Sequence, residues 1–384
     1  MDRREFLKAG AAAAGIAWLP GPALAQGAAG YRRLLVLVEL KGGNDSLNTV
    51  VPYADDAYYA LRPRIAVRRE EVQQLDERTG LHPALAPMMP LWQAKELAIV
   101  QGVGYPRPNL SHFRSIEIWD TASGSDQYLA DGWLARTFSA KPAPVDFAAD
   151  GVVVGSSDLG PLAGSGSRTI ALNETEQFLR QAKLAGGSAR RGNAALNHIL
   201  KVQGDIVQAA SHLNPNAAFR TAFPKNPFGN AVRTAAQLAA NGAGIGVIRL
   251  TLNGFDTHQN QMPVHQRLLG EFAEGLAALK GALMEIGRWD STLVLTYAEF
   301  GRRPKENASN GTDHGTAAAH FVTGGRVIGG LYGPRPSLAG LENGNLPFGV
   351  DFRSLYATAL QGWWGVPSEG PLRGRYPVLE VLKA

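Results

Sequence analysis

The chain has 384 residues, of which 45 are glycine, 23 are proline and none is cysteine. The absence of cysteine excludes disulfides, thiolate zinc sites, iron–sulfur clusters and a cysteine nucleophile. The formal net charge is +5, and basic and acidic residues are interspersed, which excludes the basic block typical of a nucleic-acid-binding protein. The length allows two or three domains, although α/β enzymes of this size often fold as one unit.

Residues 1–25 are predicted to be an export signal. A charged start containing Arg3 and Arg4 is followed by an Ala- and Gly-rich apolar run at 9–19 and by the sequence Ala-Leu-Ala at 23–25. This run is too short to span a bilayer, and no later run is long enough, so we expect no stable membrane span. The paired arginines predict the twin-arginine translocase as a partner during export and a periplasmic or secreted protein.

Strands and helices alternate along the first half of the mature chain. Unbroken apolar runs predict strands at 32–40 and 97–103, and the residue spacing predicts helices at 84–95 and 113–120. Residues 53–66 are expected to lie on the surface, and residues 124–167 show no clear pattern.

The second half begins with three predicted helices at 174–184, 194–212 and 228–240, and we expect the block 174–241 to be an inserted cap. Strands are then predicted at 245–252, 292–297 and 320–323, and helices at 263–286 and 351–364, with Asp351 as the N-cap of the last. This alternation predicts one α/β domain over residues 30–384, with a mostly parallel sheet covered by helices on both faces. The ligand site is expected at the carboxyl ends of the strands.

Polar residues that could bind a ligand follow each predicted strand. They are Asp45 after the first strand, Ser111 and His112 after the second, Asp256 and His258 after the third, Glu299 and Arg302 after the fourth, and Asp313 and His314 in the next loop. Carboxylates and imidazoles gathered at one edge are ligands for Zn²⁺, Mn²⁺, Ca²⁺ or Mg²⁺, so the pattern predicts one or two divalent ions. Arg114 and Arg302 are candidates to bind the anionic group of a substrate.

Each of these motifs also has a structural interpretation. Asp45 lies in a Gly-Gly-Asn-Asp turn, Asp256 could cap the helix that follows it, and Glu299 could form an ion pair with Arg302. Ser111 could be a nucleophile activated by a metal or a plain helix N-cap, and His112 could be a ligand or an acid–base group.

Six stretches of the sequence resemble one family. They are LKGGNDSLNTVVPY, PNLSHFRSIEIWDT, GFDTHQNQ, TYAEFGRR, GTDHGTAA and DFRSLYATAL, which run from Leu40 to Leu360. The resemblance is to the bacterial exported domain-of-unknown-function family 1501, which is in turn similar to the alkaline phosphatase and sulfatase superfamily. That resemblance implies a three-layer α/β/α sandwich, a divalent metal centre at the strand ends and hydrolysis of phosphate or sulfate esters.

The resemblance also implies roles for individual residues. Asp45, Glu299 and the pair Asp256–His258 resemble strand-end metal ligands. His314, with Asp313, resembles the last histidine of the site, and Ser111 falls near the nucleophile position, with His112 and Ser115 close by. The superfamily usually has histidine directly after the fourth-strand carboxylate, where this chain has Phe300.

Together these observations lead to one functional hypothesis and one alternative. The hypothesis is an exported, metal-dependent hydrolase whose substrate is an anionic phosphate or sulfate ester, either a small molecule or a polymer. The alternative is a non-catalytic exported module of the same fold that binds a metal or an anion.

Overall fold

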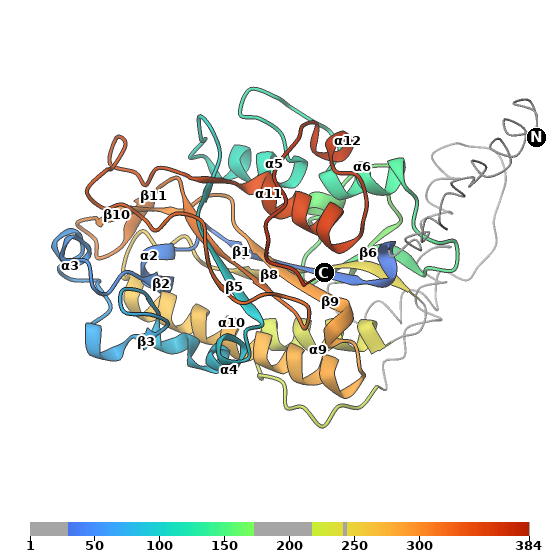
Figure 1. Cartoon of the computed structure of the whole chain (residues 1–384), viewed down its shortest axis with the longest axis horizontal. Coiled ribbons are helices and arrows are strands. Elements are labelled where there is room, and N and C mark those ends of the chain that lie inside the picture. The colour runs from blue at the N-terminus through green and yellow to red at the C-terminus, as the bar shows by residue number, and fades with distance from the viewer. Residues whose placement is uncertain (1–29, 173–216, 241–243, 384) are drawn as a thin grey trace, which may run out of the picture.

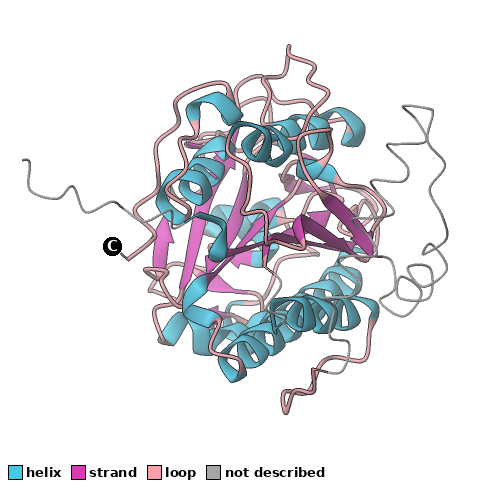
Figure 2. Ribbon diagram, turned by 90° about the vertical axis from the view of Figure 1, so that its right-hand side faces the viewer, coloured by secondary structure: helices cyan, strands magenta, loops and turns pink. Residues whose placement is uncertain are grey.

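The computed structural model describes residues 30–172, 217–240 and 244–383. The described part is a mixed α/β structure in which a large, mostly parallel sheet lies between two layers of helices (Figures 1 and 2). This confirms the predicted fold class. The sheet contains β1 (Leu34–Lys41), β5 (Leu97–Gly104), β6 (Ala149–Val154), β7 (Thr169–Leu172), β8 (Ile245–Asn253), β9 (Thr292–Tyr297), β12 (Ala318–Thr323), β13 (Gly330–Tyr332) and β14 (Val350–Asp351).

The strand order is β13-β5-β12-β9-β1-β8-β6-β7, and β14 pairs with β5. The central strand β1 is parallel to β8 and β9, and nearly all its residues are buried. Continuous apolar runs of this kind are typical of strands covered on both faces. The strand predicted at 320–323 is present as β12, but it runs antiparallel to β5 and β9, so the sheet is mixed at this side.

Side chains of β1 alternate between the two helical layers. Val36 and Val38 face the layer formed by α4 (Met89–Gln93), the preceding 3₁₀ segment Pro83–Met88, α9 (Pro227–Ala240) and α10 (Gln261–Glu285). Leu35 and Leu37 face the opposite layer. That layer contains α5 (His112–Thr121), α6 (Trp133–Ala140), α11 (Phe352–Ala357) with its π-helical continuation Thr358–Trp363, and α12 (Glu369–Leu372). Asp351 caps α11 by accepting a hydrogen bond from the Arg353 amide, as predicted.

Two regions differ from the sequence prediction. The stretch 124–167 contains α6 and β6, which the pattern did not indicate. The helix predicted at 228–240 is present as α9, but it packs against α10 and β8 within a helical layer, so this part of the expected cap belongs to the core. The segments predicted as helices at 174–184 and 194–212 lie outside the described residues.

Smaller elements surround the carboxyl ends of the strands. They are α2 (Ser46–Thr49), α3 (Asp56–Leu61), the three-stranded sheet of β2 (Val50–Val51), β3 (Gln73–Gln74) and β4 (Gly80–Leu81), and the antiparallel pair β10 (Arg302–Glu306) and β11 (Thr312–His314). Across residues 30–172, 217–240 and 244–383, the search for membrane spans finds no helix that is long and apolar enough.

Candidate metal centre

Three strand ends and one hairpin bring the candidate residues together at one edge of the sheet. His112 is the first residue of α5, which follows β5, and Asp256 and His258 follow β8. Glu299 follows β9, and the β10–β11 pair carries His314 back to the same edge, opposite Arg302. The expectation that strand-end residues meet is therefore correct for these elements.

Asp256 lies at the centre of the cluster. Its Oδ1 is 3.0 Å from Nε2 of His258 and 3.3 Å from Nε2 of His314, and its Oδ2 is 3.4 Å from Nε2 of His112. The Nε2 atoms of His258 and His314 are 2.9 Å apart. His112, Asp256 and His314 each present a ligand atom within 4.8 Å of the others. The Nε2 atoms of three imidazoles thus lie within 3.4 Å of the Asp256 carboxylate, and His112, Asp256 and His314 form the group whose ligand atoms all lie close to one another.

The other nitrogen of each ring contacts an oxygen outside this cluster. Nδ1 of His112 is 2.8 Å from Oε1 of Glu299, and Nδ1 of His314 is 2.7 Å from the carbonyl of Leu110. Nδ1 of His258 is 3.5 Å from Oδ1 of Asp313. When Nδ1–H donates to these oxygens, Nε2 of each neutral ring keeps a lone pair directed at the cluster. Such outer partners fix the tautomer and orientation of metal-binding histidines.

Glu299 is held by the turn after β1. The backbone amides of Gly42 and Gly43 donate to its carboxylate at 3.0–3.2 Å. Both glycines have positive φ, and a Cβ at Gly42 would lie 2.4 Å from the Asp256 nitrogen, so only glycine allows this close approach. Glu299 therefore positions His112 and is not a direct member of the cluster, which corrects its assignment as a metal ligand.

Arg302 is also committed to the framework. It is almost completely buried, donates to the carbonyl oxygens of Gly43, Thr312, Gly42 and Phe255, and approaches Asp256 Oδ1 at 2.6 Å. Because its donors are used in this way, Arg302 is not available to a substrate anion, contrary to the prediction. Burial would raise the pKa of Asp256, but the hydrogen bond and charge of Arg302 outweigh this and lower it. Asp256 is thus held as a carboxylate.

The pKa values of His112 and His314 are shifted in opposite directions. The hydrogen bond to Glu299 raises the pKa of His112, against the effect of its partial burial. Burial lowers the pKa of His314, and the charge of Arg302 adds to this. His314 is therefore neutral at neutral pH, the state that metal ligation requires.

Asp45 does not belong to the cluster. It caps α2 through the Leu47 amide and forms a buried ion pair with Arg62, whose nitrogens lie 2.5 and 3.0 Å from its two carboxylate oxygens. Gln261 of α10 donates to it as well. Burial would raise the pKa of Asp45, but the charge of Arg62 keeps it below its usual value. The assignment of Asp45 as a metal ligand was wrong, because both of its carboxylate oxygens are paired with Arg62.

Two further assignments change. Asp313 is exposed and contacts only the Nδ1 side of His258, along with Asn307, so it orients a ring and does not join the ligand group. Arg114 points away from the cluster to the carbonyl oxygens of residues 124, 125 and 127, and lies over the ring of Tyr128 at 3.8 Å. It anchors a loop and is not available to a substrate.

Ser111 occupies the N-cap position of α5, and its side chain makes no capping hydrogen bond. The residue is exposed, and both neighbours contact the cluster, Leu110 through its carbonyl and His112 through its ring. Ser115 is unavailable, because its buried hydroxyl donates to the carbonyl of Glu299 and contacts the Tyr105 hydroxyl. Of the two serines, Ser111 is therefore the one whose side chain is exposed and is not used as a helix cap.

Three contributors were missed by sequence analysis. Phe300 is buried, and its ring packs against His112 and His314 at centroid distances of 4.8 and 4.4 Å. Arg62 and Gln261 hold Asp45 away from the cluster. No local pattern marks Arg62 or Gln261, whereas Phe300 was visible as a departure from the superfamily.

The donor set fits a divalent cation. Imidazole nitrogens suit zinc and other transition metals, and a three-histidine, one-carboxylate set matches the ligand types found around zinc. Ca²⁺ and Mg²⁺ prefer oxygen ligands, so this cluster does not favour them. With Asp45 committed to Arg62, the described residues supply ligands for one ion at this point.

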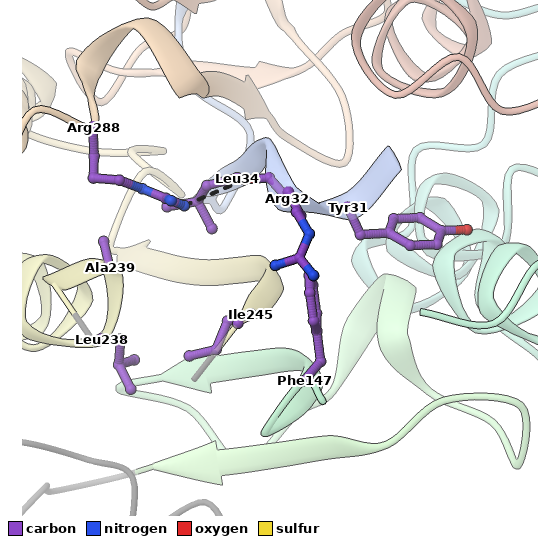
Figure 3. A pocket seen from close by; sticks show the side chains of 9 residues that line it. Tyr31, Arg32, Leu34, Phe147, Leu238, Ala239, Ile245 and Arg288 are labelled. Carbon is purple, nitrogen blue, oxygen red and sulfur yellow. Dashed lines mark hydrogen bonds between the residues drawn. The ribbon is translucent and has the colours of Figure 1, made fainter. Parts of the chain in front are cut away.

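A small hollow of about 110 Å³ lies at the opposite end of β1 (Figure 3). Arg32 and Arg288 extend into it, and Arg288 donates to the carbonyl of Arg32 at 3.4 Å. Because this is the amino end of β1, it is remote from the cluster and was not expected to hold the site.

Comparisons with known proteins give one family match and several distant structural neighbours. The model of the family described as "Protein of unknown function (DUF1501)" matches residues 77–372. No curated protein matches the chain.

Similar solved structures include Ps i-CgsB in complex with a neocarrahexaose, with 11% identity, 89% of this chain and 74% of that chain covered, and a TM-score of 0.43. The lipoteichoic acid synthase LtaP of Listeria monocytogenes shares 9% identity over 91% of this chain and 76% of its own, with a TM-score of 0.40. The alkaline phosphatase of the Antarctic bacterium TAB5 shares 12% identity over 78% and 94%, with a TM-score of 0.36. The family match covers more than half of the sequence, so the chain belongs to the DUF1501 family.

Proposed function

We propose that this protein is an exported, metal-dependent hydrolase of phosphate or sulfate esters. The observation that carries the proposal is the convergence of three imidazole Nε2 atoms on the carboxylate of Asp256. His112, His258, His314 and Asp256 would hold one ion, and the imidazole-rich donor set favours Zn²⁺ over Mn²⁺. The bound ion would polarise the ester and stabilise the charge that develops on it.

The chain's own groups have separate tasks in this proposal. Glu299 and the Leu110 carbonyl keep Nδ1 of two rings protonated, so that each Nε2 would be free to ligate an ion. The Ser111 hydroxyl attacks phosphorus or sulfur, the ester bond to the alcohol breaks, and the alcohol leaves with a proton. Water then hydrolyses the serine ester and releases phosphate or sulfate. Phe300 excludes water from one side of the rings.

Metal analysis combined with an ester screen tests the proposal. The mature protein, purified without chelators, should contain about one equivalent of Zn or Mn and should cleave p-nitrophenyl phosphate or p-nitrophenyl sulfate. A Ser111→Ala variant should keep the metal and lose turnover. If wild-type and Asp256→Ala proteins contain the same trace amount of metal, the site does not bind metal and the proposal is wrong.

A non-catalytic binding module is a second candidate, and one observation favours it. Arg114 and Arg302, the two arginines predicted to bind the substrate anion, are both committed to backbone carbonyls. A hydrolase would then have to bind the anion through the ion and the first turn of α5. Stoichiometric metal without cleavage of any ester in the screen would support this candidate.

Export is also proposed, on the strength of the amino-terminal sequence alone. The twin-arginine pathway transports folded proteins, which suits a metal-loaded site. The mature protein would then act in the periplasm or outside the cell on an anionic small-molecule or polymer ester.

A further inference from the structure

A second cavity lies at the carboxyl end of β5, the strand that precedes His112 in the chain. It has a volume of about 300 Å³ and lies between α2, the carboxyl end of β5, the start of β12 and the loop that joins β13 to β14. Its walls are mostly apolar and include Leu47, Val50, Leu346 and Phe348. A volume of this size is at the lower end of the range for small-molecule sites, which are typically about 300–1,000 Å³.

The outer wall of this cavity is anchored at both ends. β13 and β14, which flank the loop 333–349, both pair with β5 in parallel. The Gly349 amide donates to the carbonyl of Gly102 at 2.8 Å, and a Cβ at Gly349 would lie 2.3 Å from the ring of Pro334. Because Pro334, Pro336 and Pro347 also restrict the backbone, the wall is built before any ligand arrives, which lowers the entropy cost of binding.

One polar group in the lining has no partner. The Gln101 side chain of β5 is 3% exposed, and its Nε2 makes no hydrogen bond with any described residue. A buried donor without an acceptor is costly, and the great majority of such groups in folded proteins are paired. An acceptor carried by a ligand in the cavity would satisfy this donor.

The cavity is separate from the metal cluster. Ala317, which lines it, is in close contact with Gly301, and a Cβ at Gly43 would lie 2.5 Å from the ring of Phe300. The tightly packed Gly43–Phe300–Gly301 contact therefore stands between the cavity and the rings of His112 and His314.

From the cavity, its rigid apolar walls and the unpaired amide, we propose that this is a binding site for a small aliphatic molecule, or the end of an aliphatic chain, that carries a carbonyl oxygen. The chain packs against Leu47, Val50 and Leu346, and the carbonyl accepts a hydrogen bond from Gln101. This site goes beyond the proposed hydrolase activity and does not depend on it.

Titration with 2-nonanone, followed by NMR on the purified full-length mature protein, tests the site. Wild-type protein should bind the ketone saturably, with shifts confined to the residues around the cavity. Gln101→Leu keeps a side chain of similar size and removes the donor, so it should bind about fivefold to tenfold more weakly. Gln266→Leu on the surface of α10 is the matched control and should bind like wild type.

Two results would overturn the proposal. Absence of saturable binding to wild-type protein up to the solubility limit of the ketone would show that the cavity is not a site. Equal affinity of the wild-type and Gln101→Leu proteins would show that Gln101 does not recognise the carbonyl. Circular dichroism of each variant checks its fold, and neither result bears on metal content.

Discussion

The Nε2 atoms of His258 and His314 lie 2.9 Å apart, and both lie within 3.3 Å of the same oxygen of Asp256. Two imidazole nitrogens at this separation need a shared proton or a shared cation, because two lone pairs facing each other repel. The Leu110 carbonyl takes the Nδ1 proton of His314, which leaves its Nε2 as an acceptor. Variants of His258 and His314 are therefore the most sensitive test of the metal hypothesis.

Removing either ring should abolish stoichiometric metal binding. His258→Ala and His314→Ala each delete one nitrogen ligand, so we expect the bound Zn or Mn to fall from about one equivalent to below about a tenth, measured by elemental analysis after gel filtration. Asp158→Asn, which removes an exposed carboxylate elsewhere on the surface, is the control and should retain the metal. Full metal content in both histidine variants would place the ion elsewhere.

Glu299 should act on the metal through His112. Glu299→Gln keeps the shape of the side chain but replaces one of the acceptors held by Gly42 and Gly43, so His112 loses its charged partner. Loss of such an outer partner typically lowers metal affinity about 10- to 100-fold. A competition assay with a zinc chelator measures this effect. An unchanged affinity would show that Glu299 only supports the fold.

Sequence patterns predicted the sheet, and also the edge at which the candidate site residues gather, because both depend on local properties. Buried strands are continuous apolar runs, and the residues after them, such as His112 and Asp256, must meet if the strands are parallel. The direction of β12 could not be predicted, since an apolar run is the same in a parallel and an antiparallel strand. The hydrogen bonds and ion pairs of Asp45 and Arg302 could not be predicted either, because the partners of these side chains are distant in sequence and meet only in the folded chain.

Breaking the Asp45–Arg62 pair should destabilise the protein strongly. Both side chains are almost fully buried, and Arg62→Ala would leave the Asp45 carboxylate without its charge partner. Removing one member of a buried pair typically costs about 3–5 kcal/mol in the free energy of unfolding, which urea denaturation measures. The control is Arg335→Ala, which breaks a partly exposed pair with Asp76 and should cost less than about 1 kcal/mol.

The same pair should give the protein a stability change in acid. The pKa of Asp45 is lower in the folded than in the unfolded state. Its contribution to stability is therefore present above the unfolded value of 3.8 and is lost as the pH falls through the folded value. Compared with wild type, Asp45→Asn should show a smaller loss of stability between pH 5 and about pH 2.

Asp120 should have the opposite dependence on pH. It is buried near the carboxyl end of α5, and burial raises its pKa well above the usual value, which the charge of Arg249 only partly offsets. As the pH rises above the unfolded value of 3.8, the unfolded chain loses this proton while the folded protein keeps it, so folding is progressively penalised until the folded value is passed. Asp120→Asn removes the penalty. The variant should match wild type below about pH 4 and exceed it in melting temperature at pH 7.

The exposed Asp146, which pairs with Arg32, provides the control for this last experiment. Asp146→Asn changes the same functional group but not a buried one, so its melting temperature should follow that of wild type across the pH range. If Asp120→Asn is less stable than wild type at pH 7, then the carboxylate is ionised in the folded protein and Arg249 pairs with it. The inference that Asp120 is a neutral acid would then be wrong. Arg249 would be paired with two carboxylates, those of Glu39 and Asp120.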